Sequence, residues 1–397
     1  MLSRRSFLGG MSAAVVGAPL IGAALGSSAA AAPRPAAARA PGAGALPFTI
    51  VNHTYRYTNH QIYCYIVGTD LTTGRQMFVT RDGTPTQVSS FNNGSDGFAD
   101  LSIPMVPDGD THLAIPAAMS GRVYFSINDK LKFKVVTDGN GNSALQHPAG
   151  WVSSDPSFSV LHDWIEFTHN DGGMFCNTTM VDMFSIPLAI KLVGSTTQET
   201  GRLLPGGRDK IFEHVSADPD FAKLVVKDRL RIIAPGHGID GGLFPANYFD
   251  AYIDAVWNKY SSETLTVNTG SGTYTGKIVG GMFTFSGGIA PFPKPTTQDL
   301  LYCNGALSAP NDGKTGPVAA ILGAAFNRST LLSSTTQPTT DTASFYRDRT
   351  SNHFAEAMHV NSADGKAYGF PFDDVASFAS YVQDGAPTSF TVSLTNF

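Results

Sequence analysis

Charged side chains and cysteines are scarce in this chain of 397 residues. Asp, Glu, Lys and Arg make up 15 % of it, below the usual quarter or so of a soluble domain, and the formal net charge is −5. There is no basic stripe, and phosphate binding needs clustered Lys and Arg, so the composition argues against nucleic acid as a partner. The three cysteines include no C-x-x-C pair, so neither a zinc ribbon nor a thioredoxin motif is supported. The sequence leaves two alternatives for Cys64, Cys176 and Cys303: one disulfide with one free thiol, or three buried thiols.

Several signatures of catalysis are also missing. No G-x-S-x-G supports a serine nucleophile, and no H-E-x-x-H supports a metal site. Ordinary hydrogen-bonding roles, with no metal and no cofactor, are therefore predicted for the histidines His162, His169, His353 and His359. The glycine-rich segment 235–242 lacks the strand-to-helix setting of a dinucleotide loop, and we expect a structured turn there.

The N-terminus has the pattern of an export signal. A twin-arginine motif at 2–8 precedes a Gly/Ala-rich run and small residues suited to cleavage, so residues 1–32 are predicted to be a Tat signal. The alternative is an N-terminal membrane helix, but the run is too rich in glycine to favour one, and no later stretch reaches about 18–20 apolar residues. Residues 33–45 form a Pro/Ala/Gly linker that we expect to be disordered. We expect a secreted protein without a membrane partner after cleavage.

The hydrophobic pattern predicts a mostly β fold with an α/β portion. Short strands separated by turns run from 48 to about 193, among them a strand over 62–67 that ends at Gly68, and this spacing is typical of a sandwich or barrel. Helical spacing follows, and strands return at the end of the chain. We therefore predict a β-barrel or sandwich domain of 46–195 and 363–397, interrupted by a mixed α/β domain of 196–362. The expected helices are 208–215, 220–230, 245–260, 316–327 and 350–359, and the last strands are 367–372 and 389–397.

The segment 162–170 is the densest candidate for chemistry. As a strand it turns Ile165 and Phe167 to one face, and Trp164, Glu166 and Thr168 to the other. Beside an aromatic wall a Glu loses solvation, so its pKa rises and it can stay protonated to act as an acid. The alternative is an ordinary Glu on an exposed strand face.

Asp182 is a lone carboxylate among apolar neighbours. An isolated charge is costly there, so such an Asp usually has a partner or a catalytic role. Two strands joined through the turn at 171–173 would bring Glu166 and Asp182 to the same sheet. Inverting glycoside hydrolysis needs two carboxylates roughly 6.5–9.5 Å apart with a water between them. Neighbouring strands can provide that separation.

Two sequence strings carry a family resemblance. D-W-I-E-F-T-x-N at 163–170 and N-T-T-x-V-D-x-F at 177–184 resemble glycoside hydrolase family 64, the laminaripentaose-producing β-1,3-glucanases with a thaumatin-like architecture. The strand at 48–52 resembles the opening strand of thaumatin-like proteins, and the segment 364–375 resembles the closing segment of this family. The resemblance implies a β-barrel domain and a mixed α/β domain that enclose a wide cleft. It also implies endo-type inverting hydrolysis without a metal, with Glu166 as general acid and Asp182 as general base.

The resemblance extends to the sugar sites. Thr168, Asn170 and Thr179 match positions that line them, and Phe175 stands where a Trp is expected in better-known members. Thr179 has the opposite strand parity to Asp182, so a bulge or turn must intervene for both to face the cleft. Trp164 completes the predicted substrate-binding set. We expect a monomer acting on β-1,3-glucan, such as laminarin, curdlan or fungal wall glucan, and the alternative is a non-catalytic thaumatin-like glucan-binding protein.

Overall fold

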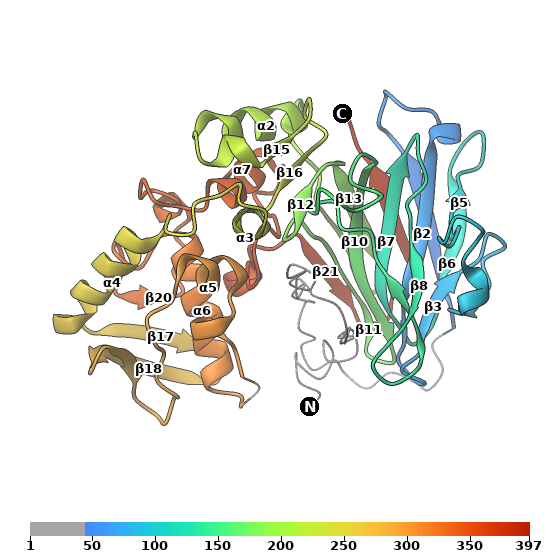
Figure 1. Cartoon of the computed structure of the whole chain (residues 1–397). Helices are drawn as coiled ribbons and strands as arrows, with labels where there is room; N and C mark the ends of the chain where they lie inside the picture. The colour runs from blue at the N-terminus through green and yellow to red at the C-terminus, as the bar shows by residue number, and fades with distance from the viewer. Residues whose placement is uncertain (1–43, 311) are drawn as a thin grey trace.

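The computed structural model describes residues 44–310 and 312–397, and two facing β-sheets form its right-hand part in Figure 1. The smaller sheet has the strand order β14-β13-β22-β1-β6. β1 pairs in parallel with β22, so the first and last strands of the described chain lie side by side. Its strands are β1 (Leu46–Asn52), β6 (Thr111–Ile115), β13 (Leu188–Val193), β14 (Thr197–Thr200) and β22 (Ser389–Leu394).

The larger sheet carries the candidate site. Its order is β21-β11-β10-β7-β2-β3-β4, with β5 paired to β2. The expected end of a strand at Gly68 is wrong, because β2 continues to Asp70. Gly68 lies opposite Gly121 of β7, and a Cβ on Gly68 would come within 2.2 Å of the Ser120 carbonyl oxygen, so these glycines allow a close approach rather than a turn. The strands are β2 (Ile62–Asp70), β3 (Gln76–Val79), β4 (Pro85–Gln87), β5 (Ile103–Pro104), β7 (Met119–Ile127), β10 (Leu161–Asn170), β11 (Gly173–Thr178) and β21 (Tyr381–Asp384).

The main core of this part lies between the two sheets. Ile165 and Phe167 of β10 pack there with Phe390 of β22 and other buried apolar side chains. Since side chains alternate along a strand, Glu166 and Thr168 point to the opposite face, as the sequence pattern predicted. That face is partly covered by a second apolar cluster beside the hairpin of β8 (Lys134–Thr137) and β9 (Ser143–Gln146).

Helices and a small sheet form the left-hand part of Figure 1, between β14 and β21 in the chain. They share one large apolar core. Twelve of the thirteen residues of α6 are buried, which is typical of a helix that is apolar on all sides. The helices are α2 (Gly207–Ala217), α3 (Pro235–Asp240), α4 (Asp250–Ser262), α5 (Thr297–Tyr302), α6 (Thr315–Asn327) and α7 (His353–Asn361).

Short strands complete this part, and one small sheet joins it to the β-sandwich region. β12, which follows β11 closely in the chain, pairs with β16, and β16 pairs with β15. The strands here are β12 (Met183–Phe184), β15 (Val225–Val226), β16 (Arg231–Ile233), β17 (Leu265–Thr269), β18 (Gly272–Val279), β19 (Met282–Phe285) and β20 (Thr336–Gln337). The 3-10 helices within residues 44–310 and 312–397 are Asn59–Gln61, Ser90–Asn92, Phe221–Leu224, Gly305–Leu307, Thr342–Ser344 and Val375–Ser377.

The mostly β fold with helices between two β stretches is confirmed, whereas the domain boundaries, the thaumatin-like classification and the wide cleft stay predictions. The predicted Tat signal and nearly all of the linker lie outside the described residues. Among those that are described, no helix is both long and apolar enough to cross a membrane. All three cysteines are buried free thiols, which decides between the two alternatives left open by the sequence.

The predicted helix over 220–230 is wrong. A 3-10 helix covers only Phe221–Leu224, and β15 then turns back to pair with β16. The turn residues Lys227, Asp228 and Arg229 have φ of 27°, 40° and 62°, which no α-helix allows. Pairing with a strand from farther along the chain therefore overrides the helical spacing.

The predicted strand over 367–372 is also wrong. Ala367 and Phe370 are buried, but this stretch has no regular structure. Asp373 holds it through side-chain bonds, because its carboxylate accepts hydrogen bonds from Gly369 N at 3.0 Å and from Arg328 Nη2 at 2.9 Å. An apolar run that is buried without a β-ladder cannot be told from a strand by its pattern alone.

Candidate active site

Glu166 lies near the middle of β10, on the face of the larger sheet that points away from the sandwich core. Its strand neighbours are Arg122 of β7 and Asn177 of β11. Oε1 of Glu166 accepts a hydrogen bond from Nε of Arg122 at 3.3 Å and lies 3.2 Å from Nη2. Glu166 is 8 % exposed, so the predicted carboxyl on the outer strand face is buried and paired with an arginine.

Asp182 approaches the same arginine from outside the sheet. β11 ends at Thr178, and Asp182 lies in a bend just before β12, so the prediction that both carboxylates share one sheet is wrong. Nη2 of Arg122 lies 3.2 Å from Oε1 of Glu166 and 3.7 Å from Oδ2 of Asp182, so these oxygens are separated by no more than the sum of those distances, about 7 Å. The structure therefore brings Glu166 and Asp182 together through Arg122, without a shared sheet.

The charges around Glu166 act in opposite directions. Burial raises the pKa of its carboxyl, the charge of Arg122 lowers it, and the charge of Asp182 raises it again, with a net rise. Oε2 of Glu166 makes no hydrogen bond of normal geometry to a described residue, although the Asn177 side chain on β11 lies close enough to lower the pKa of the carboxyl. A buried carboxyl with a raised pKa and an unpaired oxygen is suited to carry a proton on that oxygen.

Arg122 was missed by the sequence reasoning, although it contacts both carboxylates. Its guanidinium lies 4.9 Å from the ring centre of Trp164, and its Nη1 donates to the Tyr124 hydroxyl at 3.1 Å. Arg122 is one of 27 basic residues and belongs to no motif. Only the antiparallel register of β7 and β10 places it opposite Glu166.

His237 was missed as well. The segment expected to be a structured turn forms the short helix α3, and Nε2 of His237 lies 2.9 Å from Oδ1 of Asp182. The imidazole stacks on Trp151 with ring centres 4.4 Å apart, and its Nδ1 lies 2.9 Å from the Tyr302 hydroxyl. The Tyr302 hydroxyl is within hydrogen-bond distance of both Nδ1 of His237 and Asp240, so a chain of hydrogen bonds runs from Asp182 away from Glu166.

The predicted sugar-binding residues have different environments. Thr168 and Asn170 are half-buried on the same face of β10 as Glu166, and Phe175 lies opposite Thr168 on β11 at 6 % exposure. Thr179 follows the end of β11, so strand parity no longer relates it to Asp182, and the predicted interruption is present. Trp164 is 1 % exposed. It packs under Arg122, which argues against direct stacking of its ring on a sugar.

Most glycoside hydrolases use a pair of Asp or Glu carboxyl groups held a few ångströms apart, and Glu166 and Asp182 are such a pair. A family model described as β-1,3-glucanase, glycoside hydrolase family 64, matches residues 44–394. The chain therefore belongs to glycoside hydrolase family 64, as its two sequence strings indicated.

Relatives of known activity and known structure agree with this assignment. A glucan endo-1,3-β-glucosidase of Cellulosimicrobium cellulans is 37 % identical over 293 residues, which cover 70 % of this chain and 53 % of that protein. The chain thus spans about half the length of the curated relatives that it matches.

Two solved structures match nearly all of the described chain. A laminaripentaose-producing β-1,3-glucanase, crystallised in complex with laminaritetraose, is 36 % identical with a TM-score of 0.80, and the match covers 89 % of this chain and 99 % of that one. A β-1,3-glucanase domain from Clostridium beijerinckii is 29 % identical with a TM-score of 0.77, covering 89 % and 98 %.

Proposed function

We propose that this protein is a secreted, inverting endo-type β-1,3-glucan hydrolase that releases laminarioligosaccharides, mainly laminaripentaose. Membership of glycoside hydrolase family 64 and the names of its relatives support the substrate and the reaction. The observation that carries the proposal is the meeting of Glu166 and Asp182 at Arg122. The twin-arginine pattern at the N-terminus supports export.

Glu166 acts as the general acid in this proposal. Its raised pKa favours the protonated carboxyl, and Oε2 donates the proton to the glycosidic oxygen as the bond to the anomeric carbon breaks. Arg122 then stabilises the carboxylate that Glu166 becomes, because its guanidinium already contacts Oε1.

Asp182 acts as the general base. Oδ1 of Asp182 is held 2.9 Å from Nε2 of His237, which leaves Oδ2, on the Arg122 side, to take a proton from water. That water attacks the anomeric carbon from the face opposite the leaving oxygen, so the anomeric configuration inverts. An oxygen separation of up to about 7 Å is compatible with the roughly 6.5–9.5 Å of inverting enzymes and with the roughly 5–5.5 Å of retaining ones, so inversion in this proposal rests on the family resemblance.

The outer face of β10 and β11 supplies the proposed sugar contacts. Thr168 and Asn170 offer hydrogen-bonding groups, and Phe175 offers an apolar ring opposite Thr168. Thr179 adds a hydroxyl beyond the end of β11. Because Phe175 replaces the Trp expected in better-known members, the distribution of product lengths is the sensitive test of this surface.

Hydrolysis of linear β-1,3-glucan tests the proposal against the alternative of a non-catalytic glucan-binding protein. Incubation with curdlan should release reducing sugar, with a pentasaccharide as the main product by chromatography. Proton NMR of the first products should show the α-anomer, and an initial β-anomer would refute inversion. Protein that sediments with curdlan but releases no sugar would be a binding module.

A further inference from the structure

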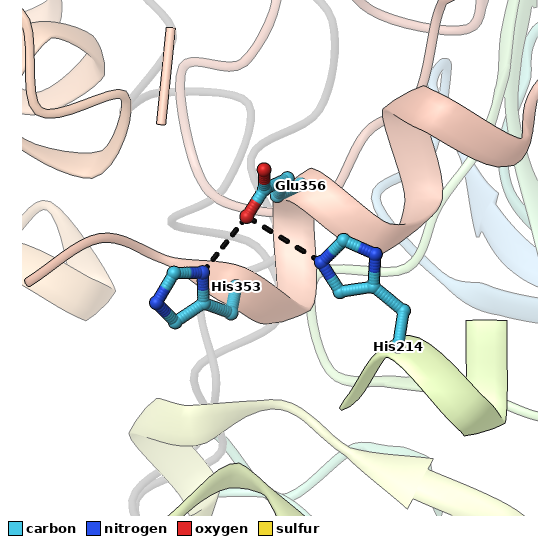
Figure 2. A group of neighbouring side chains, drawn as sticks. All are labelled: His214, His353 and Glu356. Carbon is cyan, nitrogen blue, oxygen red and sulfur yellow. Dashed lines mark hydrogen bonds and ion pairs between the residues drawn. The ribbon is translucent and has the colours of Figure 1, made fainter. Parts of the chain in front are cut away.

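Two histidines and a glutamate, which come from two helices, point toward one another (Figure 2). His214 comes from the last turn of α2, and His353 and Glu356 lie on the first turn of α7. Each offers one ligand atom, and these atoms lie within 4.8 Å of one another. All three residues are half-buried, so water and ions can reach them.

The hydrogen bonds of His353 fix which nitrogen faces the glutamate. Nε2 lies 3.2 Å from the Arg349 carbonyl oxygen, and a carbonyl can only accept, so Nε2 carries the hydrogen. In a neutral ring Nδ1 then has a lone pair, and it lies 2.8 Å from Oε2 of Glu356. Two lone pairs at this distance repel unless a proton or a metal cation lies close to both of them. Metal-bound histidines commonly donate their second N–H to a backbone carbonyl in this way.

His214 completes the group from the other helix. Its Nε2 lies 3.4 Å from the same oxygen of Glu356. Donor atoms at about 2.0–2.2 Å from a tetrahedral zinc ion lie roughly 3.3–3.6 Å from one another. The separations of 2.8 Å and 3.4 Å from Oε2 of Glu356 lie on either side of that spacing, and all three ligand atoms lie within 4.8 Å of one another. Side-chain rotation that brings the two imidazoles to that spacing would place the three ligands around one ion.

We propose that His214, His353 and Glu356 bind a divalent zinc ion that links α2 to α7. Two imidazoles and one carboxylate suit Zn²⁺, whereas Ca²⁺ and Mg²⁺ prefer oxygen ligands. Solvent supplies a fourth ligand on the exposed side. Apolar side chains of both helices belong to one core, so the ion adds a coordinate link to helices that already pack together. The sequence predicted no metal because His353 and Glu356 alone form no zinc motif, and His214 lies far away in the chain.

Zinc binding by the purified, untagged protein tests this proposal. After equilibration with ZnCl₂ and dialysis at about pH 8, where ordinary imidazoles are neutral, we expect one zinc per chain by elemental analysis. Zn²⁺ should raise the Tm by a few degrees over the value in EDTA, because a ligand that binds only the folded state stabilises it. His214→Ala and Glu356→Gln should each weaken zinc binding by more than the roughly 10–100-fold that loss of an outer-shell partner costs.

The matched control is His60→Ala, which removes an exposed histidine of the β-sandwich and should leave zinc binding unchanged. Co²⁺ provides a test that needs no variant, because a site with two imidazoles and a carboxylate should give the visible absorption of tetrahedral cobalt. Failure of the wild type to retain zinc, or to give that absorption, would overturn the proposal. So would zinc binding by folded His214→Ala that equals wild type. None of these measurements depends on glucan hydrolysis, so they test the zinc site independently of the proposed enzymatic function.

Discussion

His237 gives the sharpest prediction about how the proposed base is held. His237→Ala removes the imidazole that lies 2.9 Å from Oδ1 of Asp182 and leaves a carboxylate at 3 % exposure without that donor. A hydrogen bond to a charged group is worth about 1.5–3 kcal/mol. If this bond orients Asp182 toward the water, its loss lowers kcat by about 10- to 150-fold. KM should change little, because the bond joins two protein groups.

The assay is reducing-sugar release from soluble laminarin over a range of substrate concentrations. His237→Gln retains an amide donor and should recover part of the lost kcat, and Tyr302→Phe, which removes only the hydroxyl beyond His237, should have a smaller effect than His237→Ala. His60→Ala is the distant control, and thermal unfolding of each variant separates misfolding from misorientation. A well-folded His237→Ala with kcat within twofold of wild type would refute the reasoning.

Three further variants or reagents probe other parts of the structure. Arg122→Gln should lower activity at least about tenfold. Because the guanidinium lowers the pKa of Glu166, which must be protonated to act, the variant's kcat/KM should also persist to higher pH, and an unmoved alkaline limb would contradict this. Asp373→Asn should destabilise the fold by about 3–5 kcal/mol in urea unfolding, since it breaks a fully buried ion pair, whereas the exposed Asp254→Asn should cost under about 1 kcal/mol. Burial alone would raise the pKa of Asp373, but His359 and Arg328 lower it, and the net shift is downward. The ionised Asp373 therefore stabilises the fold less as pH falls through this pKa, so the difference in unfolding free energy between wild type and Asp373→Asn should shrink in acid. A difference that stays constant with pH would argue against the ion pair. The three cysteines, whose thiol pKa values are raised by burial, should resist a disulfide reagent in the native protein and all react in guanidinium, and a disulfide found by mass would contradict this.

Local pattern was sufficient where a face of a strand had to be assigned. Alternation along β10 placed Ile165 and Phe167 in the core and Glu166 on the opposite face, because side-chain direction follows from strand geometry alone. The prediction that Asp182, a lone carboxylate among apolar residues, has a partner is confirmed, because it lies beside Arg122 and His237.

The site residues that the local sequence pattern did not predict are brought together by contacts between distant parts of the chain. Arg122 lies 44 residues from Glu166, and His237 lies 55 residues from Asp182, so no local signal links them. Trp164 was predicted to face a sugar, but Arg122 lies over its indole and Trp151, which follows β9 in the chain, packs beside it. The same limit applies to the predicted helix over 220–230, where pairing between β15 and β16 overrides the helical spacing.

Isosteric replacement of the two carboxylates tests the central claim most directly. Glu166→Gln and Asp182→Asn keep shape and remove the acid and the base, so each should lose more than about 99 % of its reducing-sugar release from curdlan while the variant still folds and unfolds cooperatively. Activity at a tenth of wild type or above in either folded variant would contradict the assignment of Glu166 and Asp182 as the catalytic pair.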